Sequence, residues 1–207
     1  MKKDCFVFDC DEVLLDHMGG LYKFVLKYYP NIIPKTFYPN TYDLCDWLGC
    51  SQENVQEIIR HFNQNSYEFG LLEPIGSSTV LAMKNIRKKY PNAHIVVLTK
   101  SGTFGHGEVL RKVNIINKFG NDIFDDIIII EMYESKKGEL YKLSQNYNVR
   151  FLVDDYIGNI DVSRSLGIPS IMFACMHNLN YANTEDFYYA GNWRELPVII
   201  DNIMKGE

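Results

Sequence analysis

Residues 5–16 read CFVFDCDEVLLD, an apolar run that stops at Asp9 and Asp11 and then resumes. A short apolar run that ends abruptly in polar residues is typical of a strand buried on both faces of a parallel sheet. Two carboxylates at this spacing repel each other unless a cation or a proton compensates their charge. The stretch therefore predicts a buried strand that ends in a charged site.

Further buried runs of this kind follow along the chain. They are 94–99 (HIVVLT), 123–130 (IFDDIIII), 149–155 (VRFLVDD) and 169–174 (PSIMFA). Between them lie helix-like segments at 76–91, 107–120, 135–148 and 158–168. Buried strands that alternate with helices predict parallel strands joined by right-handed crossovers. The expected fold is α/β, a three-layer sandwich around a central parallel sheet.

The segment 15–72 breaks this alternation, because it carries helical patterns and no convincing buried strand. Helices are expected over 19–29, 41–49 and 51–70, with an N-cap signal at Ser51. Its many aromatic side chains form a small core of their own or, for one or two of them, a surface on which a ring-shaped substrate stacks. We expect residues 1–14 and 73–207 to form the α/β core and residues 15–72 a helical cap inserted after the first strand.

The bulk properties disfavour several classes of protein. Of the 207 residues, 46% are hydrophobic and 23% charged, which is ordinary for a globular chain. A net charge of -5 gives no electrostatic case for wrapping nucleic acid, and no apolar run reaches the roughly 18–20 residues that span a bilayer. Five cysteines, an odd number, and an Asp9 that comes too early for a signal peptide predict reduced thiols and a cytoplasmic location. The oligomeric state is left open, a homodimer included.

Polar residues gather where the predicted strands end. Ligands of open parallel sheets bind at the carboxyl ends of the strands, and several groups with catalytic chemistry fall there. The residues expected at this edge are Asp9, Asp11, Thr99, Lys136, Lys137, Asp154 and Asp155. Each is common when taken alone, but their shared position predicts a site for a cation and an anionic ligand.

With these residues, the chain resembles the haloacid-dehalogenase-like hydrolases, most of which are phosphatases. The likeness spans nearly the whole chain and rests on four short motifs. They are DCDEV at 9–13, VVLTKS at 96–101, ESKKGEL at 134–140 and FLVDD at 151–155. The resemblance implies a Rossmann-like core, a phosphatase activity and a magnesium ion.

Within that superfamily, the pattern is most similar to the 5′(3′)-deoxyribonucleotidases. Like them, the chain has a helical segment directly after the first motif, and LLEPIGSS at 71–78 resembles their approach to the next helix. The segments HNLNY and NWREL near the carboxyl terminus are similar as well. Two residues depart from the pattern beside the expected phosphate pocket: Glu12 stands where glycine is usual, and Lys100 where a serine-like residue is usual.

The expected chemistry follows from the carboxylates. A carboxylate is a competent nucleophile toward phosphorus once a divalent cation offsets the repulsion between two anions. We expect Asp9 to form an aspartyl-phosphate, and Asp11 to protonate the leaving alcohol and then deprotonate the attacking water. Mg²⁺ prefers hard oxygen ligands. The expected ligands are Asp9, the backbone carbonyl of Asp11 and Asp154, while Asp155 orients the shell or ligates through water.

The phosphate is expected to contact Thr99 and the backbone amides after Asp9. Lys100 is a further candidate for phosphate binding. Of the two adjacent lysines, Lys137 is favoured to balance charge on Asp9 and the phosphate, because the glycine that follows it fits the family pattern. Lys136 is the alternative.

The sequence predicts a Mg²⁺-dependent phosphomonoesterase with a nucleoside monophosphate, such as a deoxyribonucleotide, as the favoured substrate. Alternatives are a sugar phosphate or another small metabolite, the 3′-phosphate end of a nucleic acid, and a non-catalytic cation-binding module. The acidic balance disfavours a polynucleotide. Two histidines that follow strand ends, His106 and His177, are expected to be exposed or packing residues, and Asn178 and Trp193 to be structural.

Overall fold

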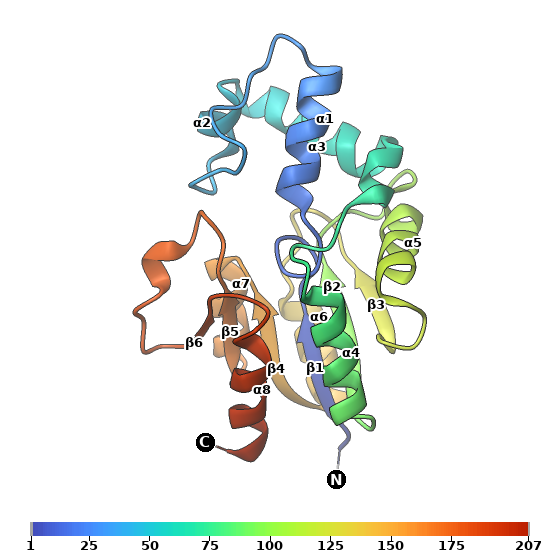
Figure 1. Cartoon of the computed structure of the whole chain (residues 1–207), viewed down its shortest axis with the longest axis vertical. Coiled ribbons are helices and arrows are strands. Elements are labelled where there is room, and N and C mark those ends of the chain that lie inside the picture. The colour runs from blue at the N-terminus through green and yellow to red at the C-terminus, as the bar shows by residue number, and fades with distance from the viewer. Residues whose placement is uncertain (1, 207) are drawn as a thin grey trace.

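The computed structural model describes residues 2–206, and its centre is a parallel sheet (Figure 1). The sheet has six strands in the order β3-β2-β1-β4-β5-β6, and every pair is parallel. The strands are Asp4–Phe8 (β1), His94–Thr99 (β2), Asp126–Ile129 (β3), Asn148–Asp154 (β4), Ser170–Phe173 (β5) and Tyr188–Ala190 (β6). Since β1 lies between β2 and β4, the DCDEV stretch leaves the sheet at its middle.

Helices cover both faces of the sheet. They are Thr79–Lys89 (α4), Gly107–Phe119 (α5), Lys137–Asn146 (α6), Ile157–Ser165 (α7) and Leu196–Lys205 (α8). Side chains of β1 alternate between the faces: Phe6 and Phe8 pack with residues of α4, α5 and α8, whereas Cys5 and Val7 pack with residues of α6 and α7. Both faces of β1 are therefore buried, which explains its continuous apolar sequence. The predicted three-layer α/β sandwich is confirmed.

One strand of the sheet was not predicted. The five expected strands are all present, but β6 adds a sixth at the edge, paired with β5. Its sequence, Tyr188-Tyr189-Ala190, is short, and only Ala190 is fully buried. A three-residue edge strand has no apolar run by which a sequence pattern can detect it.

The segment between β1 and α4 is helical, and it stands beyond the carboxyl ends of the strands (Figure 1). It contains His17–Tyr28 (α1), Leu44–Leu48 (α2), Gln52–Asn65 (α3) and the short 3-10 helix Tyr67–Leu71 (η1). The N-cap signal at Ser51 is confirmed, because its side chain accepts a hydrogen bond from the Asn54 N–H. Several aromatic rings, among them Phe24, Phe62 and Phe69, are buried against one another in this segment. These rings belong to the same buried cluster as Phe6 and Phe8 of β1.

Two connections join the helical segment to the sheet, and they run side by side. The Asp16 N–H donates to the Glu73 carbonyl at 2.8 Å, and the Ile75 N–H donates to the Leu14 carbonyl at 3.0 Å. The entering and leaving chains are thus hydrogen-bonded to each other directly above β1.

The end of α3 is also held against the loop that follows β2. The His106 N–H donates to the Gln64 carbonyl at 3.0 Å. Gly105 has a φ of +65°, and a Cβ on it would lie 2.6 Å from the Gln64 carbonyl oxygen. A Cβ on Gly107 would lie equally close to the Asn63 carbonyl oxygen. Only glycine permits this approach of the two backbones.

No helix within residues 2–206 combines the length and the hydropathy that crossing a bilayer requires.

Candidate active site

Three carboxylates from two neighbouring strands meet at the carboxyl edge of the sheet. Asp9 follows β1, Asp154 ends β4, and Asp155 comes next; β1 and β4 are paired, with Phe8 opposite Val153. One oxygen of each carboxylate lies within 4.8 Å of the others, and all three residues are buried. Burial holds the pKa of Asp9 well above its usual range, and the charges of Asp154 and Asp155 add to this. Burial also raises the pKa of Asp155.

Lys136 compensates part of this charge. Its Nζ lies 2.7 Å from Asp9 Oδ1 and 2.6 Å from Asp154 Oδ2, and its side chain is fully buried. The two carboxylates raise the pKa of Lys136 and outweigh the opposing effect of burial. Lys136 is therefore a permanent cation inside the cluster.

The preference for Lys137 over Lys136 needs correction. Lys137 is exposed and begins α6, whereas Lys136 immediately precedes that helix and points into the cluster. Successive residues around a helix start are rotated by about 100°, so the two lysines cannot face the sheet together. Gly138 does not show which lysine enters the site, because nothing in the structure requires a glycine there: a Cβ on it would meet nothing within 4 Å.

Asp154 is fully engaged by protein donors. Its Oδ1 accepts from the Tyr156 N–H at 3.0 Å and from Asn159 Nδ2 at 2.9 Å. Its Oδ2 accepts from Lys136 at 2.6 Å and again from Asn159 Nδ2 at 3.1 Å. A carboxylate has about four lone-pair sites, and these contacts occupy them. Asp154 thus holds Lys136 and the start of α7 in place.

Asp11 faces helix α5, where sequence reasoning missed a partner. Arg111 Nη2 donates to Asp11 Oδ1 at 2.5 Å, and the guanidinium lies 4.1 Å from the centre of the Phe69 ring. Although burial acts to raise it, the pKa of Asp11 is lowered by the Arg111 charge. Arg111 is fully buried. Its spacing to Ile115 and Phe119 places a cation within an apolar helix stripe, and this is the sequence signal that could have revealed it.

Two buried hydroxyl groups lie at and just after the end of β2, the strand that pairs with β1. Among the described residues, Thr99 Oγ1 and Ser101 Oγ have no hydrogen-bond partner, and both residues are fully inaccessible to solvent. Buried polar groups are nearly always paired, so these two hydroxyls are candidates for contact with a ligand. Lys100, between them, is half-buried, and its pKa is lowered by burial and then by the nearby Lys136 charge.

Glu12 occupies a position that a glycine would suit. Its φ of 58° lies in the left-handed region, which costs a non-glycine residue about 1–2 kcal/mol. The side chain compensates by accepting a hydrogen bond from the Met18 N–H at 2.8 Å, at the start of α1. Burial raises the pKa of Glu12 well above its usual range. The left-handed backbone at Glu12 is therefore offset by a hydrogen bond that its own side chain makes.

The loop after β5 contributes His177 to the site. The expected packing is seen in its contact with the Tyr42 ring, and its Nε2 also lies 2.8 Å from Asp155 Oδ2, a contact that was not predicted. Tyr42, from the helical segment, donates its hydroxyl to the Asp155 carbonyl and packs its ring 4.2 Å from the His177 ring. Asn178 and Trp193 are structural as expected: Asn178 Nδ2 donates to the Asp155 and Phe173 carbonyls, and Trp193 Nε1 to the Val13 carbonyl.

A cavity of about 300 Å³ opens between this loop and the helical segment. Its lining includes Glu12, Tyr38, Ile75, Cys175 and His177. The volume falls at the lower end of the range for small-molecule sites.

Comparison with known proteins places the fold. No family model matches the sequence, and no curated protein does. Solved structures do match: a candidate phosphoglycolate phosphatase from Lactobacillus delbrueckii has a TM-score of 0.68 and 15% identity, over 97% of this chain and 99% of that one. A haloacid dehalogenase-like hydrolase from Streptococcus pneumoniae has a TM-score of 0.65 and 13% identity, over 96% and 98%. An L-2-haloacid dehalogenase has a TM-score of 0.56 and 11% identity, over 96% and 99%.

The chain has the fold of the haloacid-dehalogenase-like hydrolases. At 11–15% identity, the likeness concerns the fold, and the resemblance expected from the four motifs is confirmed at that level.

Proposed function

We propose that this protein is a Mg²⁺-dependent phosphomonoesterase that works through an aspartyl-phosphate on Asp9. The observation that carries the proposal is the buried cluster of Asp9, Asp154 and Asp155 around one lysine. Three carboxylates and one ammonium leave negative charge that a divalent cation would compensate. The cluster offers oxygen donors, which is the chemistry that Mg²⁺ prefers.

The residues available to hold the ion differ in part from the expected set. Because Asp154 already accepts four hydrogen bonds, Asp9, the backbone carbonyl of Asp11 and Asp155 are the better candidates. When bound, Mg²⁺ would neutralise the phosphate and lower the repulsion that Asp9 meets on attack. His177 would orient Asp155 through their hydrogen bond.

The proposed reaction has two steps. A carboxylate oxygen of Asp9 attacks phosphorus while the bond to the leaving oxygen breaks, and Asp11 gives that oxygen a proton. Water then attacks the aspartyl-phosphate, Asp11 takes a proton from the water, and phosphate leaves. Since Arg111 keeps Asp11 ionised in the free protein, its acid role requires a proton taken up with the substrate. Thr99, Ser101 and Lys100 are proposed to contact the phosphoryl oxygens.

We favour a nucleoside monophosphate as substrate, with residues 15–72 acting as the cap. Among cap aromatics, Tyr38 lines the cavity beside the site and Tyr42 contacts Asp155, so a base could stack on a ring there. The second candidate is a small phosphorylated acid, as the description of the Lactobacillus structure suggests for that protein. The limited volume of the cavity is the observation that favours it.

The test is phosphate release from a panel of 5′- and 3′-nucleoside monophosphates, sugar phosphates, 2-phosphoglycolate and a 3′-phosphorylated oligonucleotide, with Mg²⁺ or with EDTA. Magnesium-dependent release from nucleotides would support both reaction and substrate class. Release only from the other compounds would retain the reaction and reject the nucleotide. If nothing is hydrolysed although Mg²⁺ binds, the protein is a cation-binding module instead.

Replacing Arg111 is expected to change the pH dependence of the reaction. Arg111→Met removes the strongest influence that lowers the pKa of Asp11, while burial still acts to raise it, so this pKa should rise. A higher pKa means that Asp11 keeps its proton up to a higher pH. Since the first step needs protonated Asp11, the alkaline limb of kcat/KM should therefore move toward higher pH. Arg111→Lys keeps the charge and should restore part of the shift. An unchanged pH profile in a folded Arg111→Met protein would contradict this role.

A further inference from the structure

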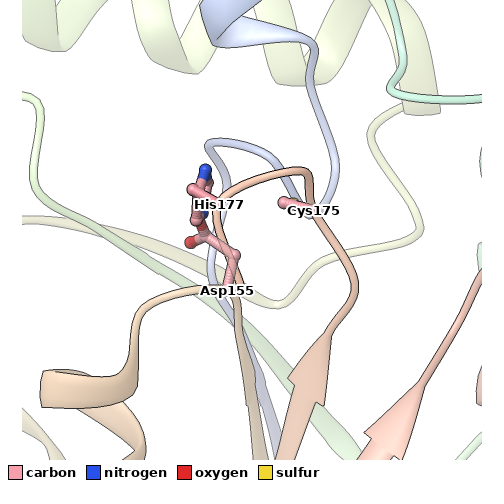
Figure 2. A group of neighbouring side chains, drawn as sticks. All are labelled: Asp155, Cys175 and His177. Carbon is pink, nitrogen blue, oxygen red and sulfur yellow. The ribbon is translucent and has the colours of Figure 1, made fainter. Parts of the chain in front are cut away.

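A second group of metal-ligating side chains lies beside the carboxylate cluster. Figure 2 shows Asp155, Cys175 and His177 gathered at the tips of β4 and β5, which are paired strands. Cys175 and His177 stand two residues apart in the loop after β5. One ligand atom from each of the three side chains lies within 4.8 Å of the other two. The phosphoryl-transfer steps proposed above give Cys175 no part.

The donor set of this group differs in kind from that of the carboxylate cluster. It combines one sulfur, one imidazole nitrogen and one carboxylate oxygen, whereas Mg²⁺ takes oxygen ligands and retains waters. Sulfur and imidazole ligands suit zinc and related borderline cations. Three protein ligands with a fourth position open to water is a common zinc arrangement. We propose that Asp155, Cys175 and His177 form a binding site for a zinc-like divalent cation, distinct in ligand chemistry from the magnesium site.

Hydrogen bonds join two of these side chains to each other and the third to the loop after β1. His177 Nε2 and Asp155 Oδ2 share a hydrogen bond of 2.8 Å, and Cys175 Sγ donates to the Glu12 carbonyl at 3.4 Å. A bound cation would take the place of the proton between His177 and Asp155 and of the Cys175 thiol proton. The three ligand atoms would then move a short distance toward the cation. Metal sites couple binding to proton release in this way.

The site also has an entry path. Cys175 and His177 both line the cavity of about 300 Å³ described above. On another side of His177, the centre of the Tyr42 ring lies 4.2 Å from the centre of the imidazole ring. A hydrated cation can therefore approach through the cavity, whose water would complete the coordination.

Asp155 belongs to both sites, and this gives the second cation a consequence. A zinc-like ion on Asp155 draws that carboxylate away from magnesium, so it inhibits the hydrolysis. The inhibition rests on the function proposed above, whereas the binding does not.

Cobalt titration tests the binding directly, because Co²⁺ reports thiolate ligation through a near-ultraviolet charge-transfer band. The wild-type protein is expected to develop this band with one Co²⁺ per chain. Cys175→Ser should abolish it, and His177→Ala should weaken the affinity about tenfold or more. Cys45→Ser, which removes a half-buried thiol in α2, and Asp9→Asn, which removes a carboxylate of the other cluster, should both retain the band.

The absence of the band in the wild-type protein would overturn the proposal, as would a band that persists in Cys175→Ser. The measurement on the wild-type protein does not depend on whether any variant folds. In the phosphatase assay, Zn²⁺ added to the Mg²⁺ form should lower the wild-type rate about tenfold, and should lower that of Cys175→Ser much less relative to its own zinc-free rate. Equal inhibition of the two would overturn the role of Asp155 as the shared ligand. If no substrate is hydrolysed at all, the cobalt band still decides the site.

Discussion

Asp9→Asn is expected to abolish phosphate release, with a loss of at least about 10³-fold in kcat, a scale typical of removing a nucleophile. The substituted amide keeps the shape of the side chain but cannot form the aspartyl-phosphate. The measurement is phosphate release under saturating Mg²⁺ with the best substrate of the panel. Retention of activity within about tenfold would show that another group attacks phosphorus.

Thermal unfolding of the same variant provides its control. The folded-state pKa of Asp9 lies above the ordinary value, so its ionisation at neutral pH disfavours the folded protein. Asn carries no charge, and Lys136 still has Asp154 as a partner at 2.6 Å. In EDTA, Asp9→Asn should therefore unfold at the same temperature as the wild type or higher. A clearly lower unfolding temperature would mean that lost activity reports lost structure.

Lys136→Met is expected to have the second largest effect, on activity and on stability together. It removes a buried ammonium that contacts Asp9 and Asp154, and breaking a buried ion pair costs about 3–5 kcal/mol. We also expect kcat/KM to fall about 100-fold or more, because the negative charge that repels a phosphate increases. Urea unfolding and phosphate release measure the two effects.

The adjacent lysine supplies a matched control. Lys137 is exposed, so Lys137→Met should change stability by no more than about 0.5 kcal/mol and leave the rate near that of the wild type. Should Lys136→Met fail to fold, the double variant Lys136→Met with Asp154→Asn removes one charge of each sign. This double variant should recover much of the lost free energy of unfolding, and its rate of phosphate release should stay low. Equal effects of the two single lysine variants would contradict the assignment of Lys136.

The central part of the fold could be predicted because β1, β2 and β4 are buried on both faces, and burial of that kind requires continuous apolar runs. Polar residues at the ends of those runs then fall at one edge, so the places of Asp9, Thr99 and Asp154 followed from the parallel direction of the strands. The short strand β6 could not be predicted in this way, since only one of its three residues is fully buried.

Other features depend on distances in space that no sequence spacing encodes. Arg111 reaches Asp11 across 100 residues, and His177 reaches Asp155 across 22 residues and a strand. The choice between Lys136 and Lys137 depended on the residue at which α6 begins, and helix boundaries are the least certain part of a sequence pattern. Here a shift of one residue exchanged a buried cation for an exposed one.

The glycine-mediated contact between α3 and the loop at 105–107 makes the two flanks of the site unequal. On that flank, the Gln64 and Asn63 carbonyls lie against the backbone of Gly105 and Gly107, which have no side chains that could move aside. On the opposite flank, Tyr38 borders open space beside Cys175 and His177. The close backbone contact on one flank and the cavity on the other therefore leave the β5 side of this sheet edge the more open of the two.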